Sequence, residues 1–283
     1  MTTTIIETKA TRIAQAATRI RRSALLMGEV QGQGYIGQAL GVADVLAVFY
    51  ARDDGELRLR PDDPGWDGRD RFLLSIGHYA IALYAALAEA GTIPLEELET
   101  YGADESRLPM SGMASYTPGM EISGGSLGHG LGVACGMGLG LRHRGNPARV
   151  FNLLSDGELD EGSTWEAALA CAHHRLSNVT AIVDVNGLQA DGPTTGVLRT
   201  EPVTAKWEAF GWHAVRVDGN DVPALLAGVD EIRSHLDGPS VLICDTRIGR
   251  GVPFLETREK AHFMPVAEHE WQAARHALEG DRS

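Results

Sequence analysis

The chain has 283 residues, and 25 Lys and Arg against 38 Asp and Glu give it a formal net charge of −13. Such an acidic chain lacks the positive surface that binding to nucleic acid or to an anionic membrane requires, and its 43% hydrophobic and 22% charged residues argue against disorder. Three scattered cysteines, with no recognisable signal peptide or membrane-spanning run, lead us to expect a cytoplasmic protein without a cysteine-built metal site.

The first third of the chain is predicted to be mainly helical. Apolar residues recur at helical spacing and predict an amphipathic helix over residues 8–28, and a second helix is expected over 42–51. The apolar run at 71–75 predicts a strand. The helix that follows this strand is expected to stop at Gly91, since glycine commonly ends helices.

From residue 112 the chain is rich in glycine, and we expect a loop followed by a helix from about Leu127. Beyond residue 149, strands are predicted to alternate with helices. The predicted strands are 149–155, 179–185, 213–219 and 239–247, and the helices between them are 163–175, 204–211 and 222–236. Continuous apolar strands between helices are typical of a mostly parallel sheet covered on both faces. We therefore predict a single α/β domain over residues 1–283.

Polar residues follow two of the predicted strands directly. Asp156 and Gly157 come after the strand at 149–155, and Asn186 comes after the next strand. Ligands of parallel α/β sheets bind beyond the carboxyl ends of the strands, and carboxylate and amide oxygens suit Mg²⁺ or Ca²⁺. On these residues alone, however, a simple strand–turn–helix in which Asp156 caps the helix is the more ordinary interpretation.

Four segments in order resemble a known family. They are FLLSIGHYAIALYAAL, TPGMEISGGSLGHGLGVACGMGLGL, the stretch from SDGEL to VNG, and TRIGRGVPFLETREKAH. Together they are similar to the motifs of transketolases, including the thiamine-diphosphate signature, in which an Asp and a metal-binding Asn lie about thirty residues apart. Asp156 and Asn186 are 30 residues apart. The resemblance covers roughly residues 30–265 and implies the thiamine-diphosphate-binding fold.

The resemblance implies a set of cofactor-binding residues. Mg²⁺ would be held by Asp156, Asn186 and the carbonyl of Leu188. The diphosphate would contact the Gly157 N–H and the His78 side chain. A diphosphate needs a divalent cation and N–H donors, which an acidic protein does not supply through its overall charge.

Further roles follow from the same resemblance. The aromatic rings of the cofactor would be enclosed by Gly125, Ser126 and Leu127. Glu161 matches a Glu that links the two cofactor sites of a family dimer, and His262 matches a His near the diphosphate and the reacting carbons. We expect His78, Glu161 and His262 to serve catalysis. The resemblance also places Glu158 among the cofactor contacts. Taken as part of an acidic run, however, Glu158 and Asp160 are expected to face solvent.

In the family, a second, pyrimidine-binding domain follows and carries the Glu that activates the cofactor. This chain ends at Ser283, where that domain would begin. The resemblance therefore implies the N-terminal subunit of a split transketolase, active only with a separate C-terminal subunit in an α2β2 heterotetramer. Its reaction would move a two-carbon unit from a ketose or 2-oxo acid to an aldehyde. The alternatives are a decarboxylating component of a 2-oxo-acid dehydrogenase, an acyloin-forming enzyme, or a non-catalytic regulatory subunit.

The sequence departs from the family pattern where the substrate would bind. Tyr35 and Ser111 stand where transketolases carry two substrate-contacting histidines, and His129 replaces a Gln. A site that lacks these partners leaves sugar hydroxyls unpaired, so we expect a less hydroxylated ketose or a 2-oxo acid such as pyruvate. Residues 32–37 also match GxGxxG, but a helix is predicted before them, which argues against a dinucleotide site.

Overall fold

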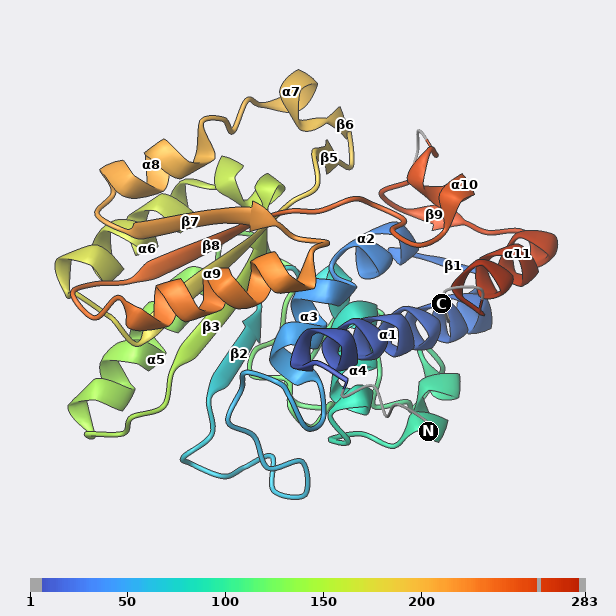
Figure 1. Ribbon diagram of the computed structural model, residues 1–283, viewed down its shortest axis with the longest axis horizontal. Helices are drawn as coiled ribbons and strands as arrows, with labels where there is room; N and C mark the ends of the chain where they lie inside the picture. The colour runs from blue at the N-terminus through green and yellow to red at the C-terminus, as the bar shows by residue number, and fades with distance from the viewer. Residues whose placement is uncertain (1–6, 259–260, 280–283) are drawn as a thin grey trace, which may run out of the picture.

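The computed structural model describes residues 7–258 and 261–279, and a five-stranded sheet forms its centre (Figure 1). The strands lie in the order β2 (Arg71–Leu74), β3 (Val150–Ser155), β4 (Val179–Val185), β8 (Ser240–Asp245) and β7 (His213–Asp218). All neighbouring strands are parallel, so their carboxyl ends meet at one edge. The predicted parallel α/β fold is confirmed.

Both faces of this sheet are buried. Successive side chains of a strand point to opposite sides, so each strand contributes to two cores. Phe72 and Leu74 join one core, whereas Leu73 between them joins a second core. The first core is covered by α1 (Lys9–Gln31), α2 (Ile36–Gly41), α3 (Ala43–Tyr50), α4 (Ala80–Glu89) and α9 (Val222–Ser234). The second is covered by α5 (Gly130–His143), α6 (Gly162–His173) and α8 (Val203–Ala209). No helix in 7–258 or 261–279 has the length and apolarity that crossing a membrane requires.

Short elements connect these layers. Two small antiparallel pairs are β1 (Gln33–Gly34) with β9 (Met264–Pro265), and β5 (Leu188–Gln189) with β6 (Gly192–Pro193). The remaining helices and 3₁₀ turns are η1 (Gly77–Tyr79), η2 (Leu95–Thr100), η3 (Asp156–Asp160), α7 (Thr194–Val197), α10 (Pro253–Glu256) and α11 (Glu268–Glu279). The β1–β9 pair is important for the site, because it holds the segment near residue 262 against the segment that follows α1.

The helix ends follow local chemistry. α1 extends to Gln31, beyond the predicted 8–28, and ends at Gly32, whose positive φ of 68° suits glycine. α4 ends at Glu89, and Gly91 turns the chain away with a φ of 81°, as predicted. The GxGxxG residues therefore form the end of α1, the short strand β1 and part of α2, and no strand precedes them. This arrangement differs from a dinucleotide-binding loop.

Candidate functional site

The turns after β3 and β4 meet at the carboxyl edge of the sheet. Asp156 is the first residue after β3, and it is only 1% exposed. Its Oδ2 accepts a hydrogen bond from the Gly187 N–H at 2.9 Å and another from the Thr194 hydroxyl at 3.2 Å. Since Gly187 directly follows Asn186, the structure brings the turns that carry the carboxylate and the amide into direct contact.

A second buried carboxylate, Asp184 in β4, orients Asn186. Its Oδ2 accepts hydrogen bonds from the Tyr79 hydroxyl at 2.9 Å and from Asn186 Nδ2 at 2.7 Å, and its Oδ1 accepts from the Thr246 hydroxyl at 2.5 Å. The amide nitrogen of Asn186 is thus held toward Asp184. Burial, with a further contribution from the charge of Asp184, raises the pKa of Asp156 to about 7. The charges of Asp156 and Asp184 repel each other, and a cation bound beside these carboxylates would reduce the repulsion.

A backbone hydrogen bond and a glycine shape the turns at this edge. Leu188, half-buried in β5, donates its N–H to Asn186 Oδ1 at 3.0 Å, which ties the turn together. Gly157 lies in η3, and a Cβ there would meet only the side chains of Ser155 and Gln189, at 3.7 Å or more. Within 7–258 and 261–279, no cluster of three His, Cys, Asp or Glu side chains could hold a metal ion by itself.

Glu158 does not face solvent, so that expectation is wrong. The residue is 0% exposed, and its Oε1 accepts hydrogen bonds from the Ser75 hydroxyl at 2.5 Å and from the Gly128 N–H at 2.8 Å. Burial raises its pKa to about 7. The side chain joins the ends of β2 and β3 to the loop before α5. Asp160 is half-buried and accepts a hydrogen bond from Gln189 Nε2 at 2.9 Å.

An aromatic cluster brings together side chains that are distant in the sequence. The centre of the Tyr35 ring lies 4.4 Å from that of His78 and 5.5 Å from that of His262. The centres of the two histidine rings are 5.6 Å apart. Gln38 Nε2 lies 2.9 Å from His262 Nδ1 and also donates to the His262 carbonyl. Burial and the nearby His262 lower the pKa of His78 to about 4, and burial lowers the pKa of His262. Phe263 extends the cluster at 5.1 Å from Tyr35.

The glycine-rich loop lies against the residue that precedes His78. A Cβ at Gly77 would lie 2.7 Å from Gly124 Cα, and the Gly112 N–H donates to the Gly77 carbonyl at 3.1 Å. Ser111 Oγ donates to the Gly124 carbonyl at 3.4 Å. The three loop positions that follow include two exposed residues and a half-buried one, in order Gly125, Ser126 and Leu127. The structure therefore places this loop and Ser111 beside the turn that carries His78.

Glu161 lies on another side of the same loop. It is exposed, it precedes α6, and its side chain lies beside Gly128, where an added Cβ would meet Glu161 Cβ at 2.6 Å. Ser163 Oγ donates to the Gly128 carbonyl at 2.9 Å and fixes this contact. His129, the residue that replaces a Gln of the family pattern, is exposed next to it. Glu161 makes no contact with the Tyr35–His78–His262 cluster among the hydrogen bonds of the described residues.

Sequence reasoning missed the polar residues that support the predicted ones. Asp184 and Tyr79 orient Asn186, Thr194 donates to Asp156, and Thr246 donates to Asp184. Asp184 did carry a signal, because an aspartate within the apolar run VTAIVDV needs partners when it is buried. The hydroxyl groups carried no such signal, since they come from segments whose contacts with this edge depend on the tertiary fold.

The chain is similar to known proteins over nearly its whole length. Residues 13–282 match the family "Transketolase, thiamine diphosphate binding domain". A transketolase family protein of Sinorhizobium fredii is 63% identical over 93% of each chain. The 6-deoxy-6-sulfo-D-fructose transketolase subunit SqwG of a Clostridium species is 37% identical over 88% of this chain and 89% of that protein.

The same similarity holds in three dimensions. The crystal structure of transketolase from Campylobacter jejuni superimposes on 97% of this chain with a TM-score of 0.88 at 27% identity. This chain spans only 43% of that structure. The likeness is therefore to one part of a longer chain in the solved structures, but to nearly the whole of the two relatives above.

Proposed function

This chain belongs to the transketolase family, and we propose that it transfers a two-carbon unit from a ketose or 2-oxo acid donor to an aldehyde acceptor as one subunit of a two-component enzyme. Transketolases are transferases that depend on thiamine diphosphate, and the matched family is their thiamine-diphosphate-binding domain. The observation that carries the proposal is the 2.9 Å hydrogen bond from the Gly187 N–H to Asp156 Oδ2, which joins the two turns that we propose bind the cofactor.

The residues at the carboxyl edge fit a magnesium ion. Asp156 offers a buried carboxylate whose pKa is raised to about 7 by burial. A bound cation would stabilise its charged form. We propose that Asp156, the amide oxygen of Asn186 and the carbonyl of Leu188 hold Mg²⁺, which prefers such oxygen ligands. Gly157 and His78 would then contact the diphosphate, with Glu158 supporting the turn from behind.

Thiamine diphosphate, when bound, supplies stabilisation of a carbanion after a carbon–carbon bond of the donor is broken. The chain's own contribution is to orient groups and to hold protons. Burial lowers the pKa of both His78 and His262, which favours the neutral form of each imidazole. We propose that a neutral imidazole here exchanges a proton with a substrate hydroxyl, while Gln38 holds His262 in place. Gly125, Ser126 and Leu127 would cover the cofactor's rings.

We propose that a separate pyrimidine-binding subunit completes the enzyme in an α2β2 heterotetramer, with Glu161 linking two cofactor sites. Two observations support this. The similar Clostridium protein is itself named a subunit and matches nearly the whole of this chain. The adjoining helices α5 and α6 also expose Val133 and Leu169, at 40% and 56%, as expected of a face that packs against another chain. We propose residues 1–283 as the diphosphate-binding domain, in the cytoplasm, where its three free buried cysteines fit the reducing conditions.

We propose that the substrate differs from the usual pentose phosphates. Tyr35 takes the place of a substrate histidine, and its ring packs against His78 and Phe263. Ser111 takes the place of a second histidine, but its hydroxyl donates to the chain's own Gly124 carbonyl. Without the two histidines, some sugar hydroxyls would lose their hydrogen-bond partners, which favours a donor with fewer hydroxyls.

A turnover assay of the mixed subunits tests this function. The chain is combined with the candidate partner subunit, thiamine diphosphate and Mg²⁺, and it is offered ketose and 2-oxo-acid donors with an aldehyde acceptor. We expect a ketose product two carbons longer than the acceptor, and no turnover by either subunit alone. Turnover by this chain alone would contradict the two-component proposal. Loss of carbon dioxide from a 2-oxo acid without transfer to an aldehyde would favour a decarboxylating component instead.

A further inference from the structure

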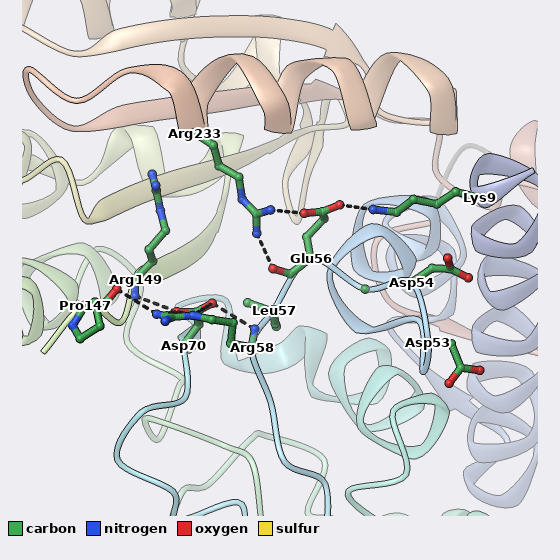
Figure 2. Close-up of a pocket in the computed structure, with 11 residues that line it drawn as sticks. Lys9, Asp53, Asp54, Glu56, Leu57, Arg58, Asp70, Pro147, Arg149 and Arg233 are labelled. Atoms are coloured by element: carbon green, nitrogen blue, oxygen red, sulfur yellow. Dashed lines mark hydrogen bonds and ion pairs between the residues drawn. The ribbon is translucent and has the colours of Figure 1, made fainter.

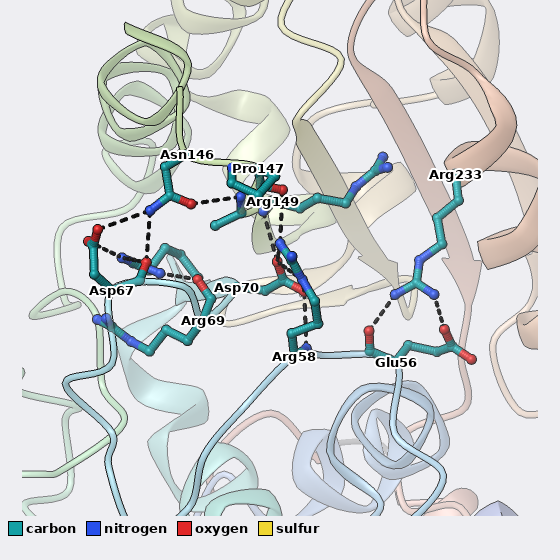
Figure 3. A network of polar contacts seen from close by, with 11 residues as sticks. Glu56, Arg58, Asp67, Arg69, Asp70, Asn146, Pro147, Arg149 and Arg233 are labelled. Carbon is teal, nitrogen blue, oxygen red and sulfur yellow. Dashed lines mark hydrogen bonds and ion pairs between the residues drawn. The ribbon is translucent and has the colours of Figure 1, made fainter. Parts of the chain in front are cut away.

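A cavity of about 520 Å³ lies at the amino edge of the sheet (Figure 2). Around it, Glu56 forms ion pairs with Lys9 and Arg233. Asp70, the residue before β2, forms an ion pair with Arg58 at 2.8 Å (Figure 3). Most charged groups around this cavity therefore already have partners of opposite charge. A buried polar atom beside the aromatic cluster, by contrast, has no partner.

This atom belongs to Gln38, a buried amide in α2 that is 1% exposed. Gln38 Nε2 donates to the His262 carbonyl at 2.6 Å and lies 2.9 Å from His262 Nδ1. Gln38 Oε1 has no hydrogen-bond partner among the described residues. The amide is thus held through its nitrogen alone.

The two contacts determine how the amide of Gln38 is oriented. A carbonyl oxygen only accepts hydrogen bonds, so the amide atom 2.6 Å from the His262 carbonyl has to be the nitrogen. The opposite orientation would bring two oxygens together at this distance and would place the nitrogen where Oε1 now finds no partner. The amide nitrogen therefore gives one hydrogen to the carbonyl and has its second for Nδ1.

This orientation also determines the tautomer of His262. Nδ1 accepts the second amide hydrogen, so it carries none of its own, and in a neutral imidazole the hydrogen then lies on Nε2. A charged ring would place an N–H at Nδ1 against the N–H of Gln38, and burial also disfavours the charge by lowering the pKa of His262. Within residues 7–258 and 261–279, the contact at Nδ1 is the only hydrogen bond of this ring.

We propose that Gln38 is a positioning residue that fixes the tautomer of His262 and so makes its Nε2–H a hydrogen-bond donor. A neutral imidazole in this state has no free nitrogen to take up a proton, because Gln38 occupies Nδ1. The proton exchange proposed above then falls to His78. The acceptor of the Nε2–H is an oxygen atom of the substrate, an assignment that rests on the proposed two-carbon transfer.

Nitrogen NMR of the histidine rings tests the tautomer on the full chain, without cofactor or partner subunit. Long-range ¹H–¹⁵N correlation spectra distinguish a ring nitrogen that carries hydrogen from one that does not, and His262→Gln identifies the signals of His262. At neutral pH we expect hydrogen on Nε2 and none on Nδ1. In Gln38→Glu, the introduced carboxylate accepts a hydrogen bond from the ring, so we expect hydrogen to appear on Nδ1.

Two further variants separate this role from a purely structural one. Gln31→Met is the matched control, because Gln31 Nε2 donates to the Tyr101 carbonyl at 2.6 Å without contacting a histidine; we expect unchanged His262 signals. In Gln38→Met, Nδ1 loses its donor, and we expect His262 to bind a proton about tenfold more tightly when the same spectra are titrated with acid. His78 and Tyr35, whose rings face His262, remain in every variant.

The tautomer proposal is overturned if His262 carries hydrogen on Nδ1 in the unaltered chain, if Gln38→Glu leaves the hydrogen on Nε2, or if Gln31→Met changes the His262 signals equally. Should Gln38→Glu not fold, Gln38→Met decides the outcome, and an unchanged proton affinity of His262 would overturn the proposal.

The mixed-subunit assay tests the assignment to a substrate oxygen. We expect Gln38→Glu to lower kcat/KM about tenfold or more, because the donor is lost, and Gln31→Met to leave it unchanged. Equal kcat/KM of Gln38→Glu and the unaltered enzyme would overturn this assignment. Absence of turnover by the unaltered enzyme would overturn the proposed function together with the assignment, whereas the NMR result on the tautomer would stand.

Discussion

A methyl group at residue 77 is expected to separate the end of β2 from the glycine-rich loop. The Cβ of Gly77→Ala would lie 2.7 Å from Gly124 Cα, and closer still to the Gly124 carbonyl carbon and the Gly125 nitrogen. All three are backbone atoms, so no side chain can rotate away to make room. Overpacking typically costs 1–3 kcal/mol, and here the loop itself must move. We therefore expect the free energy of unfolding to fall by about 3 kcal/mol.

Urea denaturation followed by circular dichroism measures this change, and Gly132→Ala is its matched control. Gly132 lies inside α5, and an added Cβ there would meet nothing within 4 Å. Since alanine favours helices over glycine, we expect Gly132→Ala to stabilise the chain by up to about 1 kcal/mol. Equal stability of the two variants would refute the packing argument. We also expect Gly77→Ala to weaken cofactor binding by the assembled enzyme, because Gly125 moves with the loop.

Three further predictions concern single side chains. His78 has a pKa of about 4 when folded, below its unfolded value of about 6.5. The unfolded chain therefore binds more protons between these values, so stability falls as the pH is lowered from 7 to 4; in His78→Gln, this loss should be smaller by about 3 kcal/mol in urea titrations. An equal loss would contradict this. Glu158→Ala leaves the buried donors of Ser75 and Gly128 without an acceptor and should cost roughly 3 kcal/mol, measured by thermal unfolding; a cost under 1 kcal/mol would argue against a supporting role. Tyr35→His should raise kcat/KM for hydroxylated ketose phosphates about tenfold in the mixed-subunit assay. If the ratio of kcat/KM between hydroxylated and less hydroxylated donors did not change, residue 35 would not select the substrate.

The sheet and its carboxyl edge were predictable from local patterns. The runs at 149–155 and 179–185 are mainly apolar and lie between helices, which is how strands buried on both faces appear in a sequence. Parallel strands place their carboxyl ends at one edge, so the sequence predicts that Asp156 and Asn186 lie close together. The short helix α2 was not predicted, because it is buried on all sides and shows no amphipathic spacing.

Other features depend on contacts between distant segments. Glu158 was expected to face solvent because it belongs to an acidic run, but Ser75 and Gly128 come from elsewhere in the chain and make its burial tolerable. The aromatic cluster joins Tyr35 to His262 through the β1–β9 pair, which is two residues long and has no sequence signature.

The central claim is that the turns after β3 and β4 jointly hold a divalent cation on the diphosphate of the cofactor. Calorimetric titration of thiamine diphosphate into the assembled enzyme, with and without Mg²⁺, tests it most directly. We predict tight binding only with Mg²⁺, and a loss of at least tenfold in affinity for Asp156→Asn and Asn186→Ala, with Asp160→Asn unaffected. Tight binding without the metal, or unaltered affinity in both Asp156→Asn and Asn186→Ala, would contradict the account.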